Sequence, residues 1–195
     1  MIGLIFGPPG SGKGTQATRI QDAFRMDHLS TGEILRHEVA EGTAIGQEAA
    51  RIMATGDLFP DDLMDQIVKG RLERLRPDAS VLLDGFPRTI AQARALDGML
   101  KDLGRIVGFV VALDVPDSVL IDRLLHRAEV EGRADDTRKA IEERMHEYHT
   151  RTAPVLEHYR TTGVPVVEVD GRGEVAAVFE LIQAALRPKI GAGGI

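Results

Sequence analysis

The chain has 195 residues, with 24 Lys and Arg against 30 Asp and Glu, which gives a formal net charge of −6. Its length and 43% hydrophobic content fit one soluble globular domain. The absence of Cys excludes disulfide frameworks, thiolate zinc sites and Cys nucleophiles, and it favours a cytoplasmic location. The acidic balance argues against binding to nucleic acid or to an anionic membrane surface. No apolar run is long enough to span a membrane, and the N-terminus lacks a secretory pattern, so no membrane partner is expected.

Short apolar runs predict buried strands at 2–6, 81–83, 106–113 and 164–169. Helical spacing predicts the intervening helices, which cover about 13–24, 31–39, 43–56, 61–75, 90–103, 117–127, 137–159 and 175–186. Ser30 and Glu33 have the spacing of a helix N-cap box. This alternation predicts an α/β three-layer domain with a parallel sheet, and the several helices before residue 81 predict a helical insertion. Residues 188–195 are predicted to form a disordered tail.

The segment 7–15 is a glycine-rich loop between a predicted strand and a predicted helix. Its glycines allow consecutive amides to point at an anion, and the helix adds its positive end. Lys13 can then reach the terminal phosphates of a nucleotide, and Thr15 can approach a magnesium ion. The usual motif has Ser or Thr directly after the Lys, whereas Gly14 intervenes here. The alternative is an ordinary glycine-rich turn, which the strand–loop–Lys–helix context disfavours.

Asp84 closes the apolar run at 81–83, where a carboxylate suits magnesium or its water ligands, although it could also cap the next helix. Arginines are the second signal, because several lie at segment ends or in polar loops. Guanidinium groups of this kind stabilise the charge that develops during phosphoryl transfer. Periodicity alone does not choose among Arg36, Arg88, Arg127, Arg133 and Arg144 and the other arginines.

Four motifs occur in order, Gly7–Thr15, Leu29–Glu33, Asp84–Arg88 (Asp-Gly-Phe-Pro-Arg) and Gly132–Asp136. Together they resemble the adenylate kinases, in the nucleoside monophosphate kinase family, and the resemblance covers about residues 1–186. It implies a P-loop NTPase fold with a five-stranded parallel sheet, including one more strand near 27–29. It also implies a single domain with two insertions, a helical NMP-binding arm at 30–59 and a short lid at 126–136. Longer lids in some relatives hold zinc with four Cys, so no zinc site is expected here.

The resemblance implies a role for each matching residue. The expected ATP contacts are Gly10, Ser11, Gly12, Lys13, Gly14, Thr15, Arg127 and Gly173. The expected AMP contacts are Thr31, Arg36, Asp57, Leu58, Phe59, Gly85, Phe86, Pro87, Arg88, Gln92, Arg133 and Arg144. The expected catalytic residues are Lys13, Arg88, Arg127, Arg133 and Arg144, with Asp135 and Asp136 in lid closure and Asp84 and Thr15 at the magnesium ion. Phe59 stands where the family usually has Val.

The implied activity is reversible, Mg²⁺-dependent transfer of the ATP γ-phosphoryl group to AMP, which yields two ADP and serves adenine nucleotide homeostasis. Thr31 with Gln92 favours adenine, because an amide offers a donor and an acceptor together. A UMP/CMP-type kinase is the nearest alternative. A non-catalytic nucleotide-binding adaptor would not require the arginine set, and a P-loop hydrolase would leave Thr31, Arg36 and Arg88 without a purpose. The partners expected are ATP, AMP and ADP, bound by a monomer.

Overall fold

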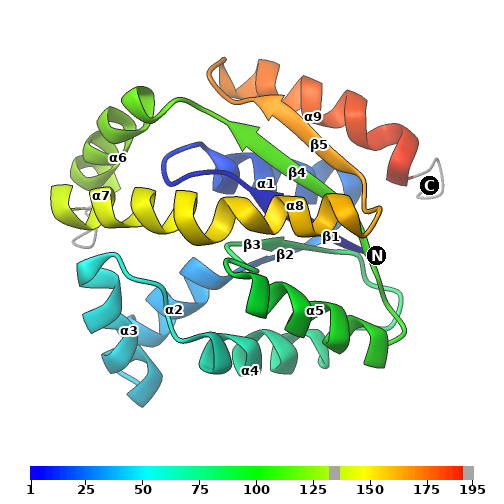
Figure 1. Ribbon diagram of the computed structural model, residues 1–195, viewed down its shortest axis with the longest axis horizontal. Coiled ribbons are helices and arrows are strands. Elements are labelled where there is room, and N and C mark those ends of the chain that lie inside the picture. Colours follow the sequence, from blue (N-terminus) through cyan, green and yellow to red (C-terminus); the bar gives the residue numbers. More distant parts are fainter. Residues whose placement is uncertain (132–136, 191–195) are drawn as a thin grey trace.

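A parallel sheet forms the centre of the computed structural model, which describes residues 1–131 and 137–190 apart from the side chains of Arg127, Glu129 and Glu131. In the described residues its five strands have the order β2-β3-β1-β4-β5 (Figure 1). The strands are β1 (Ile2–Phe6), β2 (Asp27–Ser30), β3 (Val81–Asp84), β4 (Val107–Asp114) and β5 (Val166–Asp170). The predicted α/β class and the parallel sheet are confirmed.

Helices cover both faces of the sheet (Figure 1). Helices α1 and α9 pack on one face, and α4, α5 and α8 pack on the other. The helices and their bounds are α1 (Lys13–Phe24), α2 (Thr31–Ala40), α3 (Ala44–Thr55), α4 (Asp61–Leu72), α5 (Ile90–Asp102), α6 (Asp117–Glu131), α7 (Arg138–Glu147), the π-helical turn η1 (Tyr148–Thr152), α8 (Ala153–Thr161) and α9 (Val175–Ile190). The sheet is therefore the middle of three layers, as the sequence predicts.

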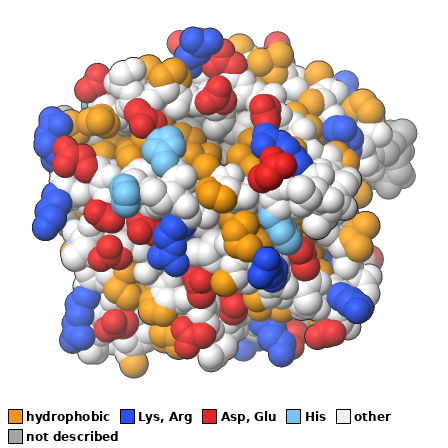
Figure 2. Space-filling view, in the orientation of Figure 1, with side chains coloured by type: hydrophobic (Ala, Val, Ile, Leu, Met, Phe, Trp, Pro, Cys, Tyr) orange, Lys and Arg blue, Asp and Glu red, His pale blue; other side chains and the backbone are white. Residues whose placement is uncertain are grey.

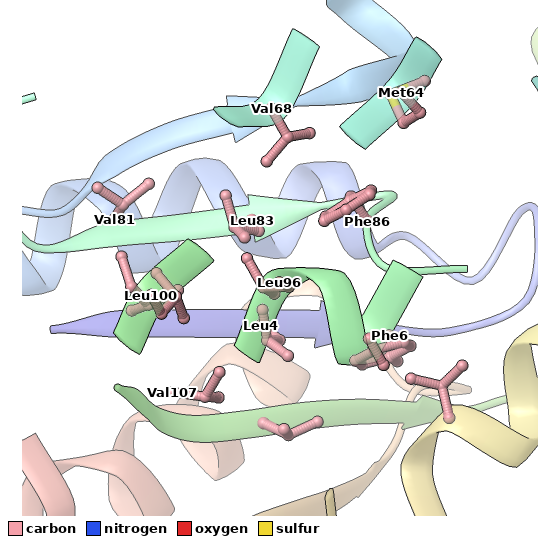
Figure 3. Packing of buried hydrophobic residues seen from close by; sticks show 14 of the residues in the cluster. Leu4, Phe6, Met64, Val68, Val81, Leu83, Phe86, Leu96, Leu100 and Val107 are labelled. Carbon is pink, nitrogen blue, oxygen red and sulfur yellow. The ribbon is translucent and has the colours of Figure 1, made fainter. Parts of the chain in front are cut away.

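The central strand β1 is buried along its whole length, which explains its unbroken apolar sequence. Side chains alternate across a strand, so Leu4 faces the layer of α4 and α5 while Ile5 faces α1 and α9. Figure 3 shows Leu96 and Leu100 of α5 packed against the strands beside Leu4 and Leu83. Burial of these side chains holds the strands in place and so fixes where the loops at the strand ends begin.

The long helix predicted at 137–159 is interrupted by η1. Pro154 has no backbone N–H and cannot continue an α-helical ladder, and the N–H of Ala153 instead bonds to the carbonyl of Tyr148, five residues back. The turn places Thr152 inward, where its Oγ1 donates to the carbonyl of Arg88 at 3.0 Å. The interruption therefore ties the α7–α8 segment to the loop that follows β3.

Three helix ends differ from the prediction by three residues or more. Helix α4 ends at Leu72 rather than near 75, and α6 continues to Glu131, so the described part of the predicted lid is helical. Helix α9 extends to Ile190 because Leu186 is buried and Ile190 packs against the same core cluster. The predicted disordered tail was therefore placed too early, since 188–190 are helical, and 191–195 lie outside the described residues.

The chain leaves β1 and β3 toward opposite sides of the sheet, because β2 lies beyond β3 on one side and β4 lies beyond β1 on the other. Ligands of such sheets bind at the carboxyl ends of the strands where the direction of connection reverses. The loop after β1 is the glycine-rich segment, and β3 ends at Asp84, which pairs in register with Ile5. The glycine-rich loop and Asp84 therefore meet at the same edge of the sheet, at the carboxyl ends of β1 and β3.

On the face shown in Figure 2, the described acidic and basic side chains are intermixed. Of the helices in the described ranges, none has both the length and the apolar character that crossing a membrane requires.

Candidate functional site

The glycine-rich loop joins β1 to α1 in a left-handed conformation at two points. Gly10 has φ 80° and Gly12, the N-cap of α1, has φ 84°, angles that other residues adopt only with strain. No side chain caps α1, so its first amides stay open to a ligand. Lys13 begins the helix and donates from Nζ to the carbonyl of Pro8 at 3.3 Å across the loop. This geometry suits an anion held by backbone amides and one lysine.

A cavity opens beside this loop and is lined by residues from five separate segments of the chain. Lys13 and Gly14 line it from the glycine-rich loop, and Asp84 lines it from the end of β3. Every described residue predicted to contact AMP lines the same cavity, namely Thr31, Arg36, Asp57, Leu58, Phe59, Gly85, Phe86, Pro87, Arg88, Gln92 and Arg144. Gly10, Ser11, Gly12 and Thr15 are not among its lining residues.

Three arginines, Arg36, Arg88 and Arg144, line this cavity close enough to act on one another electrostatically. Burial lowers the pKa of the Arg88 guanidinium, and the nearby cations of Arg144 and Arg36 lower it further, although Asp84 opposes them. Arg88 donates from Nε to the carbonyl of Gly85 at 2.8 Å, and Arg144 donates from Nη2 to the carbonyl of Met53 at 3.3 Å. Cations that lower the pKa of Arg88 favour an anion beside it, because the anion relieves their repulsion.

The carboxylate of Asp84 is buried and ionised. Burial alone would raise its pKa, but His28, Lys13 and Arg88 outweigh burial and lower it. His28 Nε2 lies 3.4 Å from Asp84 Oδ2. A Cβ added at Gly14 would lie 3.8 Å from that same oxygen, so Asp84 sits against the start of α1. It is therefore a hard anionic oxygen beside the loop, the type of ligand that Mg²⁺ prefers.

Thr31 and Gly85 hold the α2 side of the cavity against the loop after β3. Thr31 Oγ1 donates to the carbonyl of Gly85 at 2.9 Å. Gly85 has φ 80°, and a Cβ there would lie 2.7 Å from Thr31 Oγ1 and 3.1 Å from Arg88 Nη2. A side chain at this position would therefore be both strained and in collision. The N-cap predicted for α2 is confirmed, because Ser30 Oγ accepts the N–H of Glu33 at 3.4 Å.

Gln92 lies in the first turn of α5 and is only 2% exposed, yet it lines the cavity. Its Oε1 accepts the backbone N–H of Arg88 at 2.7 Å, and its Nε2 donates to Asp61 Oδ1 at 2.7 Å. Each of these amide atoms can make one more hydrogen bond. Gln92 can thus present a donor and an acceptor to a ligand in the cavity.

The remaining wall of the cavity is apolar. Phe59 is buried in the main core cluster and also lines the cavity, together with Leu35, Ile52, Met53 and Met64. The larger side chain at position 59 is therefore accommodated by packing against the core. A cavity that has both apolar side chains and a group of arginines in its lining suits a ligand with a flat base and a phosphate group.

Gly173 lies apart from this cavity, in the segment after β5. The neighbouring loop is fixed by Arg123 of α6, whose guanidinium donates to the carbonyls of Gly171 at 3.4 Å and Arg172 at 3.3 Å. Strands β1 and β5 run parallel, so the loops after them lie at the same edge of the sheet, with β4 between. Gly173 is therefore on the correct edge for a nucleotide that starts at the glycine-rich loop, although it does not line the described cavity.

Four of the predicted residues are not placed. Arg133, Asp135 and Asp136 lie outside the described residues, as does the side chain of Arg127, whose backbone belongs to α6. The predicted contacts of these residues stay predictions.

Sequence reasoning missed four polar residues that support the cavity. His28 precedes the end of β2, a strand too short and polar to be predicted from periodicity. Asp61 lies in the first turn of α4, where Pro60 holds the N-cap position and no side chain caps the helix. Thr89 donates to Asp61 Oδ2 at 2.8 Å, and Thr152 donates to the carbonyl of Arg88. No periodic signal marks these contacts, because their partners are distant in sequence.

The carboxyl group of Asp65, in the first turns of α4, is expected to make the free energy of unfolding depend on pH. Burial, then the charges of Asp61 and Asp62, raises the pKa of Asp65 from 3.8 to about 6. A raised pKa favours folding while the group is protonated, and this contribution is lost as the pH rises through about 6. We expect Asp65→Asn to raise the free energy of unfolding at pH 8 and to change it little at pH 4.

Urea unfolding at the two pH values measures this effect, with Asp78→Asn in the exposed turn before β3 as the control. An equal gain at both pH values would contradict the electrostatic cause.

Comparison with known proteins agrees with this geometry. The family model described as adenylate kinase matches residues 5–164. An adenylate kinase of Micrococcus luteus is 46% identical over 193 residues, which cover 98% of this chain and 94% of the relative. The adenylate kinase of Stenotrophomonas maltophilia (strain K279a) is 42% identical over 94% of this chain and 98% of its own length. That of Xylella fastidiosa (strain M23) is 43% identical over 94% of this chain and 97% of its own length.

Proposed function

The chain belongs to the adenylate kinase family, and we propose that its described cavity is the AMP site at which this phosphotransferase reaction takes place. The observation that carries the proposal is the convergence of Lys13 with Arg36, Arg88 and Arg144 around one cavity that also has an apolar wall. A P-loop that only hydrolysed ATP would need no second group of arginines beyond the phosphate loop. A second phosphorylated substrate accounts for them.

In this proposal the amides of the loop and Lys13 hold the β- and γ-phosphates of ATP, while Arg36, Arg88 and Arg144 hold the phosphate of AMP. An oxygen of the AMP phosphate attacks the γ-phosphorus in line. The bond from the γ-phosphorus to the β–γ bridging oxygen breaks, and two ADP result. No covalent enzyme intermediate is needed, because the residues act by positioning the phosphates and stabilising their charge.

Members of the family use Mg²⁺ with ATP, and the residues at this edge fit the ion. The observation that supports the fit is the buried, ionised Asp84 against Gly14. Among the described residues no group of three or more His, Cys, Asp or Glu could hold a metal. Mg²⁺ is commonly held by few carboxylates and by the phosphates of its nucleotide, where it neutralises their charge. Asp84, acting through water, and Thr15 are the residues proposed to hold it.

For the base, we propose that the Gln92 amide bonds the edge of adenine while Phe59 and its apolar neighbours pack on the ring. Thr31 supports this side of the cavity through its bond to Gly85. The arm at 30–59 supplies α2 and α3, and the lid at 126–136 is proposed to bring Arg127 and Arg133 to the phosphates. The single-domain organisation, the monomeric state and the cytoplasmic location stay predictions.

Acceptor specificity tests the proposed site. The purified protein is mixed with Mg-ATP and, separately, AMP, CMP, UMP or GMP, and ADP and free phosphate are quantified. We expect about two ADP per AMP consumed and little free phosphate, because AMP rather than water takes the phosphoryl group. Transfer to CMP or UMP instead of AMP would overturn the assignment of the base contacts. Release of phosphate without an acceptor would contradict the role proposed for the three arginines.

A further inference from the structure

The side-chain amide of Gln92 has a fixed orientation. Its Oε1 accepts from the backbone N–H of Arg88, and its Nε2 donates to the carboxylate of Asp61, each at 2.7 Å. A backbone N–H can only donate, and an ionised carboxylate can only accept. Rotation of the amide by a half turn would therefore break both hydrogen bonds and place like groups against each other. The chemistry of its two partners leaves one orientation.

Asp61 is itself anchored at its second oxygen. Thr89 Oγ1 donates to Asp61 Oδ2 at 2.8 Å, and the same hydroxyl accepts the N–H of Gln92 as the N-cap of α5. Thr89 is 6% exposed, so these bonds lie largely away from water. Asp61 thus joins the first turn of α4 to the first turn of α5. It does not line the cavity, whereas Gln92 does, so it can reach a bound base only through Gln92.

The orientation of this amide matters for the choice of base. Adenine presents an acceptor at N1 and a donor at its 6-amino group. A 6-oxopurine, such as the hypoxanthine of IMP, presents a donor at N1 and an acceptor at O6 in the same two places. An amide free to turn over could bond either edge, whereas a fixed amide bonds one and leaves unpaired groups against the other.

We propose that Asp61 is a positioning residue that fixes the Gln92 amide and thereby sets the preference for a 6-aminopurine over a 6-oxopurine monophosphate. The proposal rests on the proposed function of Gln92 as the base contact. It assigns a specificity role to a carboxylate that lies outside the cavity.

The test compares AMP and IMP as acceptors in Asp61→Ala. We expect KM for AMP to rise about tenfold, with kcat at saturating AMP and KM for ATP nearly unchanged, because only base binding is weakened. The ratio of kcat/KM for AMP to that for IMP is expected to fall by about tenfold. An unchanged ratio overturns the proposal, as does a loss that falls on kcat and KM for ATP alike.

Two controls separate positioning from general support of the fold. Asp62→Ala removes an exposed acid from the same first turn of α4 and is expected to leave every kinetic constant unchanged. In a Gln92→Ala background, Asp61→Ala is expected to add less than about twofold to KM for AMP, because Asp61 acts through the missing amide. Effects that multiply in the double variant would overturn the proposal.

Asp61→Asn covers the case in which Asp61→Ala does not fold. Its amide can still accept from Gln92 and can donate to Thr89 Oγ1, but it can also turn over, so we expect the AMP-to-IMP ratio to fall by about threefold. If Gln92→Ala leaves KM for AMP unchanged, the proposed base contact is wrong. If Gln92→Ala raises that KM and neither Asp61 variant changes the ratio, only the positioning role is wrong.

Discussion

In Arg88→Ala, we expect kcat/KM for AMP to fall by about 10³- to 10⁵-fold, the range found when an arginine at a transferring phosphoryl group is removed. Arg88 lies in the cavity with Nε held by the carbonyl of Gly85, so its remaining N–H groups are oriented for a phosphate. Its pKa is lowered by burial and by Arg144 and Arg36, which indicates a cation that is better stabilised once an anion arrives. Steady-state assays in both directions measure the loss.

Two further variants show whether the loss of activity in Arg88→Ala comes from the guanidinium group itself. Arg88→Lys keeps the charge but not the planar fork, and it is expected to recover only part of the activity. Arg94→Ala removes an exposed arginine from α5 and is expected to behave as the wild type. The melting temperature of Arg88→Ala should stay within a few degrees of the wild-type value, because the change removes a buried cation from among like charges. Activity within tenfold of the wild type would contradict the proposed role.

The second large effect is expected on the ATP side. Lys13→Ala should lower kcat by about 10²- to 10³-fold, because the side chain supplies a positive charge where the β- and γ-phosphates are proposed to lie. Lys13 spans the loop to Pro8 and also lowers the pKa of Asp84. Its removal should therefore raise the pKa of Asp84, which a carboxyl titration by NMR detects in the ligand-free protein.

Lys101→Ala, an exposed lysine of α5, is the matched control for the loss of one positive charge. An unchanged kcat in Lys13→Ala would contradict phosphate binding by the loop. If kcat falls but the pKa of Asp84 does not change, the proposed contact between Lys13 and ATP still stands. That result would contradict the electrostatic coupling between Lys13 and Asp84.

Residues with a periodic or motif signal were predicted well. The bounds of α1 and β1 agree with the prediction, since an apolar run and helical spacing both result from burial on the sheet. The glycine-rich loop was predicted from its own residues, because its backbone angles demand glycine. Strand β2 came only from the family resemblance, since its sequence Asp-His-Leu-Ser carries no apolar alternation.

The arrangement of the cavity could not be derived from spacing. Thr31, Arg88 and Arg144 meet there through packing between segments far apart in the chain, and only the resemblance selected them from other polar residues. Asp61 shows the same limit, because a carboxylate in a first helical turn ordinarily indicates a favourable helix-dipole interaction. Its hydrogen bonds to Thr89 and Gln92 depend on how α4 packs beside α5.

A crystal structure of the protein with AMP bound tests most directly whether the described cavity is the acceptor site. We expect the AMP phosphate to lie within hydrogen-bonding distance, about 3 Å, of Arg36, Arg88 and Arg144, with the adenine edge against the Gln92 amide. The 6-amino group should face Gln92 Oε1, and N1 should face Nε2. AMP bound with its phosphate on the glycine-rich loop, or with its base away from Gln92, would contradict the assignment of this cavity as the acceptor site.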